Sequence, residues 1–299
     1  MIKTSAMERN VYFRSGSLKL SAVLAIPNGM QQGESRPAFV VLHGFGSTKN
    51  AGNVIRPTEM LSALGYVTLR FDMRGCGESE GKKGHVICLE QVEDTRSAIS
   101  WLFEQPEVEP ERVVLLGSSF GAAVAVYTAG IDSRPACVIS SGGWGNGERK
   151  FRGQHKTAER YEQFLAMLEA GRKHKEATGQ SLQVSRYAIV PIPEHLRNHV
   201  VHGSIETFPV DTAQSMFDFR AEDVVGKISP RPVIFLHSSE DSVTPTEQSI
   251  AMFDRAGLPK DLHLFAETDH FMFDESNMRV RDVVTAWLNR FFPVRIAEN

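Results

Sequence analysis

The sequence predicts an α/β protein with a doubly wound, mostly parallel sheet that carries a helical cap insertion. Short apolar runs alternate with amphipathic segments along most of the 299 residues, as in parallel strands joined by crossover helices. Several of these runs are continuously apolar, which suits strands that are buried on both faces. The alternation is interrupted only from about Trp144 to Val225.

The first half of the chain reads as a hairpin followed by strand–helix units. Two strands turn at Ser15-Gly16-Ser17, and the second places alternate apolar residues on one face. Gly65 ends the first helix, and Pro106 and Pro110 end the second. We expect strands at 37–44, 66–72, 112–118 and 136–143, and helices at 54–64, 89–103 and 120–130.

The interrupted stretch contains one long helical pattern, closed by Gly179, and two irregular segments. A structureless loop of about 80 residues does not suit a compact domain, so we expect a cap or lid over the C-terminal edge of the sheet. The predicted core is 1–143 and 226–299, and the predicted cap is 144–225. The last part of the core should contain strands at 231–239 and 261–267 and helices at 247–256 and 278–292.

The composition excludes several classes of function. The formal net charge of −3 gives no sign of the strongly basic surface that nucleic-acid-binding proteins need. No apolar run approaches the roughly 18–20 residues that span a bilayer, and the N-terminus lacks the apolar region of a signal peptide, so we expect a cytoplasmic protein. His199 and His202 lack a third ligand in a suitable frame, and the three cysteines show no C-x-x-C spacing. We therefore expect no metal and no other cofactor.

Gly117-x-Ser119-x-Gly121 stands between a predicted strand and a predicted helix. This is the pattern of a nucleophile elbow, a sharp turn that exposes its central side chain. A β-carbon two positions to either side would collide with the neighbouring strand or helix, which explains both glycines. The symmetric spacing selects Ser119 rather than Ser118 as the candidate nucleophile. The alternative is a glycine-rich turn with two capping serines.

A second strand end carries the turn His43-Gly44-Phe45. Such a turn can aim the backbone N–H of Phe45 into the site. Together with the N–H of Phe120, directly after the candidate nucleophile, it would form a two-donor oxyanion hole. We expect His43 itself to pack and to hydrogen-bond the loop rather than to catalyse.

Two further strand ends carry candidate partners for the serine. Asp241 follows a buried strand and precedes a Val-Thr-Pro turn, where a carboxylate can orient an imidazole; the adjacent Glu240 is the competing carboxylate. His270 follows the last strand and is the candidate general base. Its neighbour Asp269 is poorly placed to bind it, because adjacent side chains rarely face each other. The elbow comes first in the chain, followed by the carboxylate and then the histidine.

Five short stretches carry a family likeness: HGFG (His43–Gly46), FDMRGCGESEG (Phe71–Gly81), GSSFG (Gly117–Gly121), HSSEDSVTP (His237–Pro245) and TDH (Thr268–His270). In these stretches the sequence resembles the α/β-hydrolase superfamily, in the serine-esterase and acylpeptidase-like branch that includes feruloyl and cinnamoyl esterases. The likeness covers about residues 10–141 and 225–295. It implies that Asp72, Arg74 and Ser79 shape a loop beside the nucleophile rather than do chemistry.

The expected activity is cleavage of a carboxylic ester in a small-molecule acyl substrate through an acyl-enzyme. The same triad attacks thioesters and amides and can pass the acyl group to an alcohol or amine. Thioesterase, amidase or peptidase, and acyltransferase activities therefore stay open, as does a ligand receptor on a hydrolase fold. A homodimer is compatible with the sequence. Large apolar residues of the cap either line an acyl pocket or pack together: Trp144, Phe151, Tyr161, Phe164, Met167, Tyr187, Phe208, Met216, Phe217 and Phe219.

Overall fold

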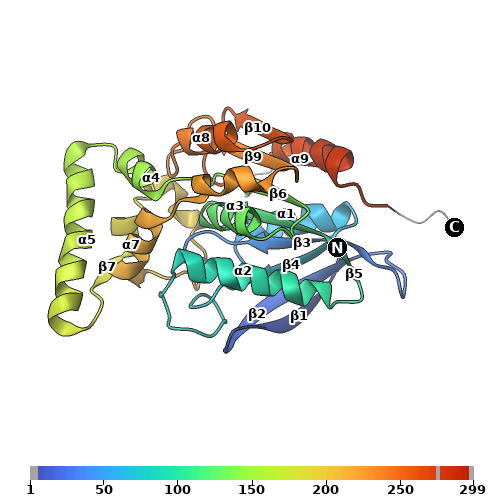
Figure 1. Ribbon diagram of the computed structural model, residues 1–299, viewed down its shortest axis with the longest axis horizontal. Helices are drawn as coiled ribbons and strands as arrows, with labels where there is room; N and C mark the ends of the chain where they lie inside the picture. The colour runs from blue at the N-terminus through green and yellow to red at the C-terminus, as the bar shows by residue number, and fades with distance from the viewer. Residues whose placement is uncertain (1–5, 274–276, 296–299) are drawn as a thin grey trace.

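A computed structural model describes residues 6–273 and 277–295. Its middle layer is an eight-stranded sheet with the order β1-β2-β4-β3-β5-β6-β9-β10 (Figure 1). β2 pairs antiparallel with both β1 and β4, and all other pairs are parallel. The strands are β1 (Ala6–Ser15), β2 (Leu18–Pro27), β3 (Arg36–Leu42), β4 (Val67–Phe71), β5 (Val108–Ser118), β6 (Cys137–Ser141), β9 (Val233–Ser238) and β10 (Lys260–Phe265).

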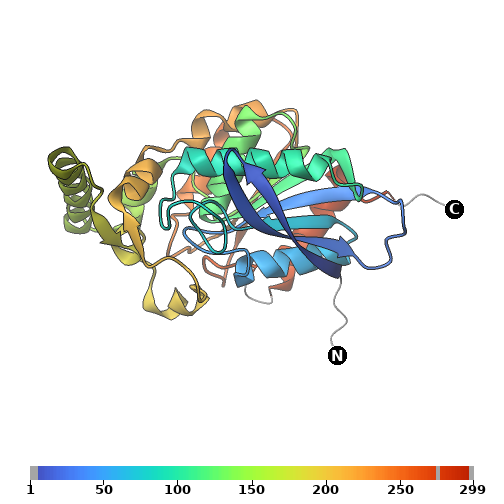
Figure 2. The same ribbon diagram turned by 90° about the horizontal axis from the view of Figure 1, so that it is seen from below.

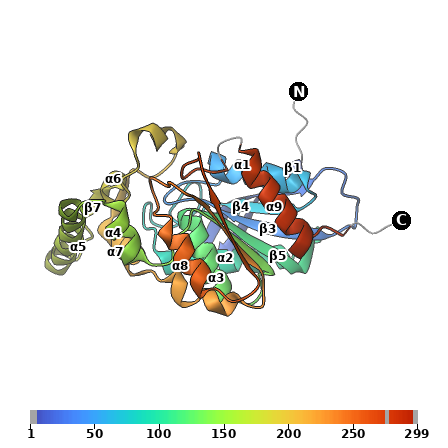
Figure 3. The ribbon, with the colours of Figure 1, turned by 90° about the horizontal axis from the view of Figure 1, so that it is seen from above.

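Helices cover both faces of this sheet, as a doubly wound fold requires. Figure 3 shows α1 (Gly52–Ala63) and α9 (Met278–Phe291) on one face. On the other face lie α2 (Cys88–Phe103), α3 (Phe120–Ile131) and α8 (Glu247–Arg255). Because the central strands bury side chains on both faces, the apolar residues form two clusters, one under each helical layer. The continuously apolar strands of the sequence are explained by this double burial.

Residues 144–225 add no strand to the large sheet. Figures 1 and 2 show the long helix α5 standing at one end of the molecule, away from both marked chain ends. The β7–β8 pair is antiparallel. The elements of this segment are α4 (Gly147–Gln154), α5 (Ala158–Thr178), β7 (Gln183–Ser185), α6 (Arg186–Ile189), η1 (Glu194–His199), β8 (Thr207–Pro209), α7 (Val210–Asp218), η2 (Ala221–Asp223) and the first residue of η3 (Val225–Ile228).

The long helix of this segment ends where the sequence predicts. Gly179 follows α5 in the left-handed conformation, with φ 73°, and its N–H bonds to the carbonyl of Lys175, which is a common helix C-cap. Tyr161, Phe164 and Leu168 bury one stripe of α5, while most of its other residues are exposed. The stripe attaches the helix to the rest of the segment and leaves its outer side in solvent.

Most predicted elements are confirmed, with two differences. β5 begins at Val108, four residues before the predicted strand, and includes Pro110. A register irregularity opposite Arg36 and Ala38 accommodates the early start. The sequence also gave no sign of α4, α7 or the β7–β8 pair, because segments this short carry too few periods to reveal their type.

The predicted division into a core and a cap stays a prediction, and residues 1–5 and 296–299 of that core lie outside the described residues. No helix in the described part of the chain is long and apolar enough to cross a membrane. Cys76, Cys88 and Cys137 are all buried as free thiols, and burial raises their pKa values, so they pack as small apolar side chains.

Candidate active site

The junction between β5 and α3 forces Ser119 into an unusual backbone conformation. Its φ is 56° and its ψ is −116°, a region that costs energy for any residue with a side chain. A Cβ on Gly117 would lie 2.1 Å from the carbonyl oxygen of Gly121, and one on Gly121 would lie 2.6 Å from the carbonyl oxygen of Leu42. Both positions therefore need glycine, and the close packing holds the strained turn in place.

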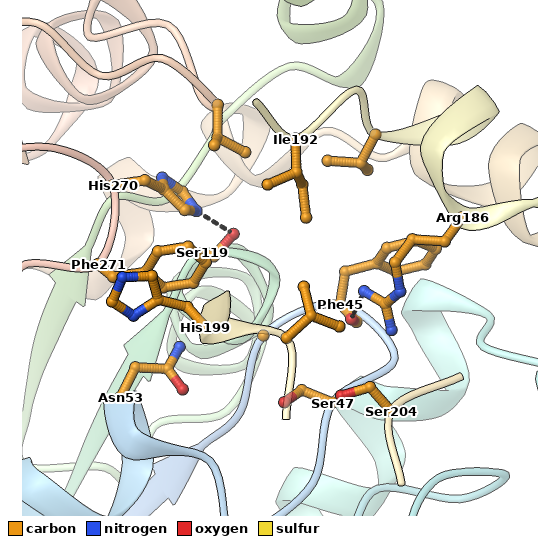
Figure 4. A pocket seen from close by; sticks show the side chains of 14 residues that line it. Phe45, Ser47, Asn53, Ser119, Arg186, Ile192, His199, Ser204, His270 and Phe271 are labelled. Carbon is orange, nitrogen blue, oxygen red and sulfur yellow. Dashed lines mark hydrogen bonds between the residues drawn. The ribbon is translucent and has the colours of Figure 1, made fainter. Parts of the chain in front are cut away.

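The two adjacent serines point to different partners. Ser118 is buried and accepts a hydrogen bond from the side-chain amide of Asn53 at 3.1 Å. Ser119 Oγ lies 2.8 Å from Nε2 of His270, and Figure 4 shows the two side chains facing each other at the edge of a pocket. The structure thus brings Ser119, and not Ser118, to the histidine.

A carboxylate holds the other side of the imidazole. Nδ1 of His270 lies 2.7 Å from Oδ2 of Asp241, and both side chains are almost fully buried. Burial opposes the charged form of Asp241, but the electrostatic interaction with His270 and the hydrogen bonds from His237 and His270 outweigh it, so the pKa of Asp241 lies below its usual range. An ionised carboxylate only accepts hydrogen bonds, so Nδ1 carries the ring proton and Nε2 accepts from the Ser119 hydroxyl.

The two neighbouring acids have other positions. Glu240 is exposed, and its backbone N–H donates to Ser238. The carboxylate of Asp269 accepts from the backbone N–H of Ser242 at 2.8 Å and from that of His270 at 2.7 Å. Asp269 therefore joins the two loops that carry Asp241 and His270, and it does not bind the imidazole of its neighbour.

Sequence reasoning missed a second histidine on Asp241. His237 is fully buried, with Nε2 3.2 Å from Oδ2 of Asp241 and 3.0 Å from the carbonyl oxygen of Thr244. Both partners are acceptors, so Nε2 carries the proton and Nδ1 accepts from the Ser249 hydroxyl at 2.6 Å. The only sequence signal is a histidine within a buried strand four residues before the aspartate.

The turn after β3 lies beside the nucleophile, as predicted. A Cβ on Gly44 would lie 3.8 Å from the Cβ of Ser119. The turn is closed by a bond from Ser47 N–H to the Gly44 carbonyl at 3.2 Å. Among the described residues, neither the N–H of Phe45 nor that of Phe120 has a hydrogen-bond partner, and their role as oxyanion donors stays a prediction.

His43 joins loops rather than the reacting groups. Nδ1 lies 2.8 Å from the carbonyl oxygen of Gly44, and Nε2 accepts from the Met73 N–H at 3.1 Å. Because His43 is fully buried, desolvation lowers its pKa and keeps the ring neutral. Its contacts agree with the packing role expected from the sequence.

The loop after β4 is likewise held by hydrogen bonds and a salt bridge. Asp72 accepts from the N–H of Lys49 at 2.6 Å and from that of Glu78 at 2.9 Å. Arg74 forms a salt bridge with Asp94 at 2.6 Å, and the Ser79 hydroxyl donates to the Asp72 carbonyl. These contacts stabilise the loop and include no bond to Ser119.

The pocket at Ser119 lies between the sheet edge and the 144–225 segment. Its empty space, with the open solvent at its mouth included, is about 480 Å³. The wall differs from the one the sequence offered: none of the large aromatic or methionine residues named in the 144–225 segment lines it. Several of them pack against one another instead, as Phe151 does on Phe164 with ring centroids 4.4 Å apart. The segment contributes Arg186, Val190, Ile192, His199, Val200 and Ser204.

No group of three metal-ligating side chains gathers within the described ranges 6–273 and 277–295. His199 stacks on Phe271 with ring centroids 4.6 Å apart, at the wall of the pocket. His202 is not among the residues that line this pocket. The expected absence of a metal at this pair stays a prediction.

The parallel sheet, the elbow after β5 and the groups at the neighbouring strand ends define the α/β-hydrolase fold. Residues 33–277 match the hydrolase family described as "Serine aminopeptidase, S33". The chain therefore belongs to this family within the α/β-hydrolase superfamily.

Several relatives match most of the chain. A 31.7 kDa protein of the traX-finO intergenic region in Escherichia coli is 27% identical over 284 residues, 91% of this chain and 97% of the relative. Thiohydrolase aneE of Aspergillus aculeatus is 26% identical over 259 residues, 78% of each chain.

Many solved structures share the fold. The α/β hydrolase GrgF of a Penicillium species has a TM-score of 0.76 at 20% identity, covering 96% of this chain and 98% of GrgF. Est1E of Butyrivibrio proteoclasticus with bound ferulic acid has a TM-score of 0.67 at 19% identity, covering 94% and 98%. At this identity the likeness shows the fold alone.

Proposed function

We propose that this chain is a serine hydrolase that cleaves a carboxylic ester, with Ser119 as nucleophile, His270 as general base and Asp241 as its orienting carboxylate. The observation that carries the proposal is the 2.8 Å separation of Ser119 Oγ and His270 Nε2 on a strained elbow. The 2.7 Å contact between His270 and Asp241 supports the same assignment. We further propose that residues 144–225 form a cap over the acyl pocket.

In the proposed mechanism, Ser119 Oγ attacks the acyl carbonyl while its proton passes to Nε2 of His270. The N–H groups of Phe45 and Phe120 stabilise the oxyanion of the tetrahedral intermediate. His270 then gives the proton to the leaving alcohol as the carbon–oxygen bond breaks, which leaves an acyl-Ser119 ester. Water, deprotonated by the same imidazole, attacks this ester and releases the acid. Asp241 stays ionised throughout and balances the imidazolium charge.

An ester of a small acid suits the pocket. Val190, Ile192 and Val200 give it an aliphatic side, and its empty space, with the open solvent at the mouth included, is about 480 Å³. An apolar acyl chain that binds to this side is stabilised by roughly 25 cal/mol for each Å² of apolar surface that it buries. We therefore propose short to medium aliphatic acyl groups as the first substrates to test.

A thioester is the second candidate, because a relative that matches 78% of this chain is a thiohydrolase. The same nucleophile attacks both carbonyls, so the two substrates differ in the leaving group. A ratio of kcat/KM for p-nitrophenyl butyrate and for butyryl-N-acetylcysteamine decides between them. Addition of an acceptor alcohol tests acyl transfer in the same assay, since transfer gives a new ester rather than the acid.

The assignment of the nucleophile is tested by Ser119→Ala and Ser118→Ala in parallel. We expect Ser119→Ala to lower kcat for p-nitrophenyl butyrate by about 10⁴–10⁶-fold, while Ser118→Ala retains most of the activity. Mass spectrometry of the wild type should find a fluorophosphonate adduct on Ser119. Equal activity of Ser119→Ala and wild type would contradict the proposal, and a stoichiometric burst without turnover would favour a receptor.

A further inference from the structure

The turn that carries the proposed oxyanion donor Phe45 is held by a residue of the 144–225 segment. Arg186, the first residue of α6, places its guanidinium against this turn at the pocket wall (Figure 4). Nη1 donates to the carbonyl of Phe45 and Nη2 to that of Gly46, both at 2.8 Å. Nε donates to the carbonyl of Ile205 at 2.7 Å, so the side chain joins the segment to the turn.

This guanidinium is buried, and the carboxylate of Glu206, which acts on it through space, forms no ion pair with it. Arg186 is only 4% exposed, and no carboxylate of the described residues forms an ion pair with it. Burial lowers its pKa to about 10, so it stays protonated at neutral pH. An unpaired buried cation is costly, and here three backbone carbonyls accept hydrogen bonds from it.

The contact also explains why residue 46 is glycine. Gly46 has φ +52°, and a Cβ there would lie 2.4 Å from Cζ of Phe208 and 3.0 Å from Nη2 of Arg186. The rings of Phe45 and Phe208 stack with centroids 4.3 Å apart, and the guanidinium lies 5.4 Å from each. The turn, the guanidinium and the segment are therefore packed too closely to move independently.

The bonds around the turn fix the direction of the Phe45 N–H. The carbonyl of Gly44 belongs to the same peptide, and it is bound by His43 and by the Ser47 N–H. In a trans peptide the N–H points opposite to the carbonyl, so these bonds fix the peptide plane that precedes Phe45. Arg186 donates to the carbonyls of Phe45 and Gly46 and fixes the peptide planes that follow Phe45.

We propose that Arg186 is a positioning residue for the oxyanion hole: it orients the Phe45 N–H, and its charge favours the oxyanion that forms beside the turn. The inference rests on the proposed serine-hydrolase function and deepens it. It makes the 144–225 segment part of the machinery that stabilises the transition state, in addition to its role as a wall of the acyl pocket. Preorganised donors and nearby positive charge both lower the barrier to forming a tetrahedral oxyanion.

The test compares Arg186→Lys, Arg186→Gln and Arg186→Met with the matched control Arg197→Gln. Arg197 also lies in the segment and donates to a backbone carbonyl, that of Ile192 at 3.2 Å, but it makes no bond to the turn. With p-nitrophenyl butyrate we expect kcat to fall by about 10–100-fold in the Gln and Met variants, near the range for loss of an oxyanion donor. KM should change little, the Lys variant should be intermediate, and Arg197→Gln should behave as wild type.

A second readout separates positioning from general loss of structure. A trifluoromethyl ketone forms a tetrahedral oxyanion on the serine, so its Ki should rise across the Arg186 variants by the factor by which kcat/KM falls. Millimolar guanidinium ion should restore part of the activity of Arg186→Gly. Thermal melts identify any variant that fails to fold. If the Gln and Met variants fail to fold, the Lys variant, which keeps the charge, is compared with the wild type.

The outcomes distinguish this inference from the proposed function. If a fluorophosphonate labels Ser119 equally fast in wild type and in Arg186→Gln, Arg186 does not position the hole, and the hydrolase assignment stands. A rise in KM with unchanged kcat and unchanged ketone Ki would make Arg186 a substrate-binding residue and overturn the inference. If wild type is neither labelled nor active, the proposed function itself is wrong, and the inference is overturned with it.

Discussion

A single residue, His237, supports the proposed triad through its contact with the carboxylate of Asp241. Oδ1 of Asp241 accepts from the N–H groups of Val243 and Thr244 at 2.8 and 2.7 Å, and Oδ2 accepts from both histidines. Each oxygen of the carboxylate therefore has two donors. A carboxylate held in this way cannot rotate away from His270 during the reaction.

We expect His237→Phe to lower kcat by roughly 10-fold, because loss of one charge-assisted hydrogen bond of about 1.5 kcal/mol leaves Asp241 freer to turn. Ser249→Ala should have a smaller effect, since it removes only the hydroxyl that binds Nδ1 of His237. Steady-state kinetics with p-nitrophenyl butyrate measure both variants. Wild-type kcat in a folded His237→Phe protein would show that the backbone donors alone suffice.

At the scale of elements, α4 buries a lysine whose amine makes no hydrogen bond to the described residues. Lys150 is 2% exposed, and within the described part of the chain its Nζ has no hydrogen-bond partner. The ammonium lies 3.8 Å from the ring centroid of Phe151, and burial lowers the pKa of Lys150 to about 7. The helix therefore carries a desolvation cost that its aromatic contact only partly offsets.

Replacing this lysine by methionine should stabilise the protein. We expect Lys150→Met to raise the free energy of unfolding at pH 7 by on the order of 1–3 kcal/mol, the cost of an unsatisfied buried polar group. In the wild type the pKa of Lys150 in the folded protein lies below its value in the unfolded chain, so the stability of the wild type rises with pH from about 7 toward 10. The difference in stability between Lys150→Met and the wild type therefore narrows over this range. Urea unfolding at pH 7 and pH 9 measures both effects.

Lys173→Met on α5 is the matched control, because that side chain is 69% exposed. Its free energy of unfolding should stay within about 0.5 kcal/mol of the wild type. A loss of stability in Lys150→Met would mean that the amine binds a group inside the fold and is needed there.

At the scale of the whole molecule, Asp132 joins elements that are distant in sequence. Its carboxylate accepts from Arg134 Nε at 2.9 Å and from Arg96 Nε of α2 at 3.2 Å. Its carbonyl accepts from Arg231, just before β9, at 3.0 Å. Burial raises the pKa of Asp132, but the bonds to Arg134 and Arg96 dominate and lower it to about 2.

This network predicts part of the acid sensitivity of the fold. The folded pKa of Asp132 is below the unfolded value, so its contribution is present above about pH 4 and is lost as pH falls toward 2. Asp132→Asn should therefore destabilise by roughly 1 kcal/mol at pH 7, after allowance for the solvent-screened arginines. Denaturant unfolding at pH 7 and pH 3 checks this, with the exposed Asp254→Asn as control. An equal loss at both pH values would argue against the charge as the cause.

Much of this architecture follows from local pattern. The strand, Gly-x-Ser-x-Gly and helix order sets the elbow, because only glycine fits where the Gly117 and Gly121 backbones approach their neighbours. The candidate residues at strand ends come together because parallel strands end at one edge of the sheet. The choice of Asp241 over Glu240, made from the turn that follows, agrees with the contact to His270.

The sequence by itself determined the fold class, the elbow and the residues that meet Ser119, since each depends on spacing along a few neighbouring residues. Only the tertiary structure decided the aliphatic wall of the pocket, the second histidine on Asp241 and the contact of Arg186 with a turn 141 residues earlier in the chain. The 144–225 segment has short elements and little periodicity, so its side chains acquire their neighbours only when it packs on the sheet edge. That packing places an arginine on the turn of the proposed oxyanion hole.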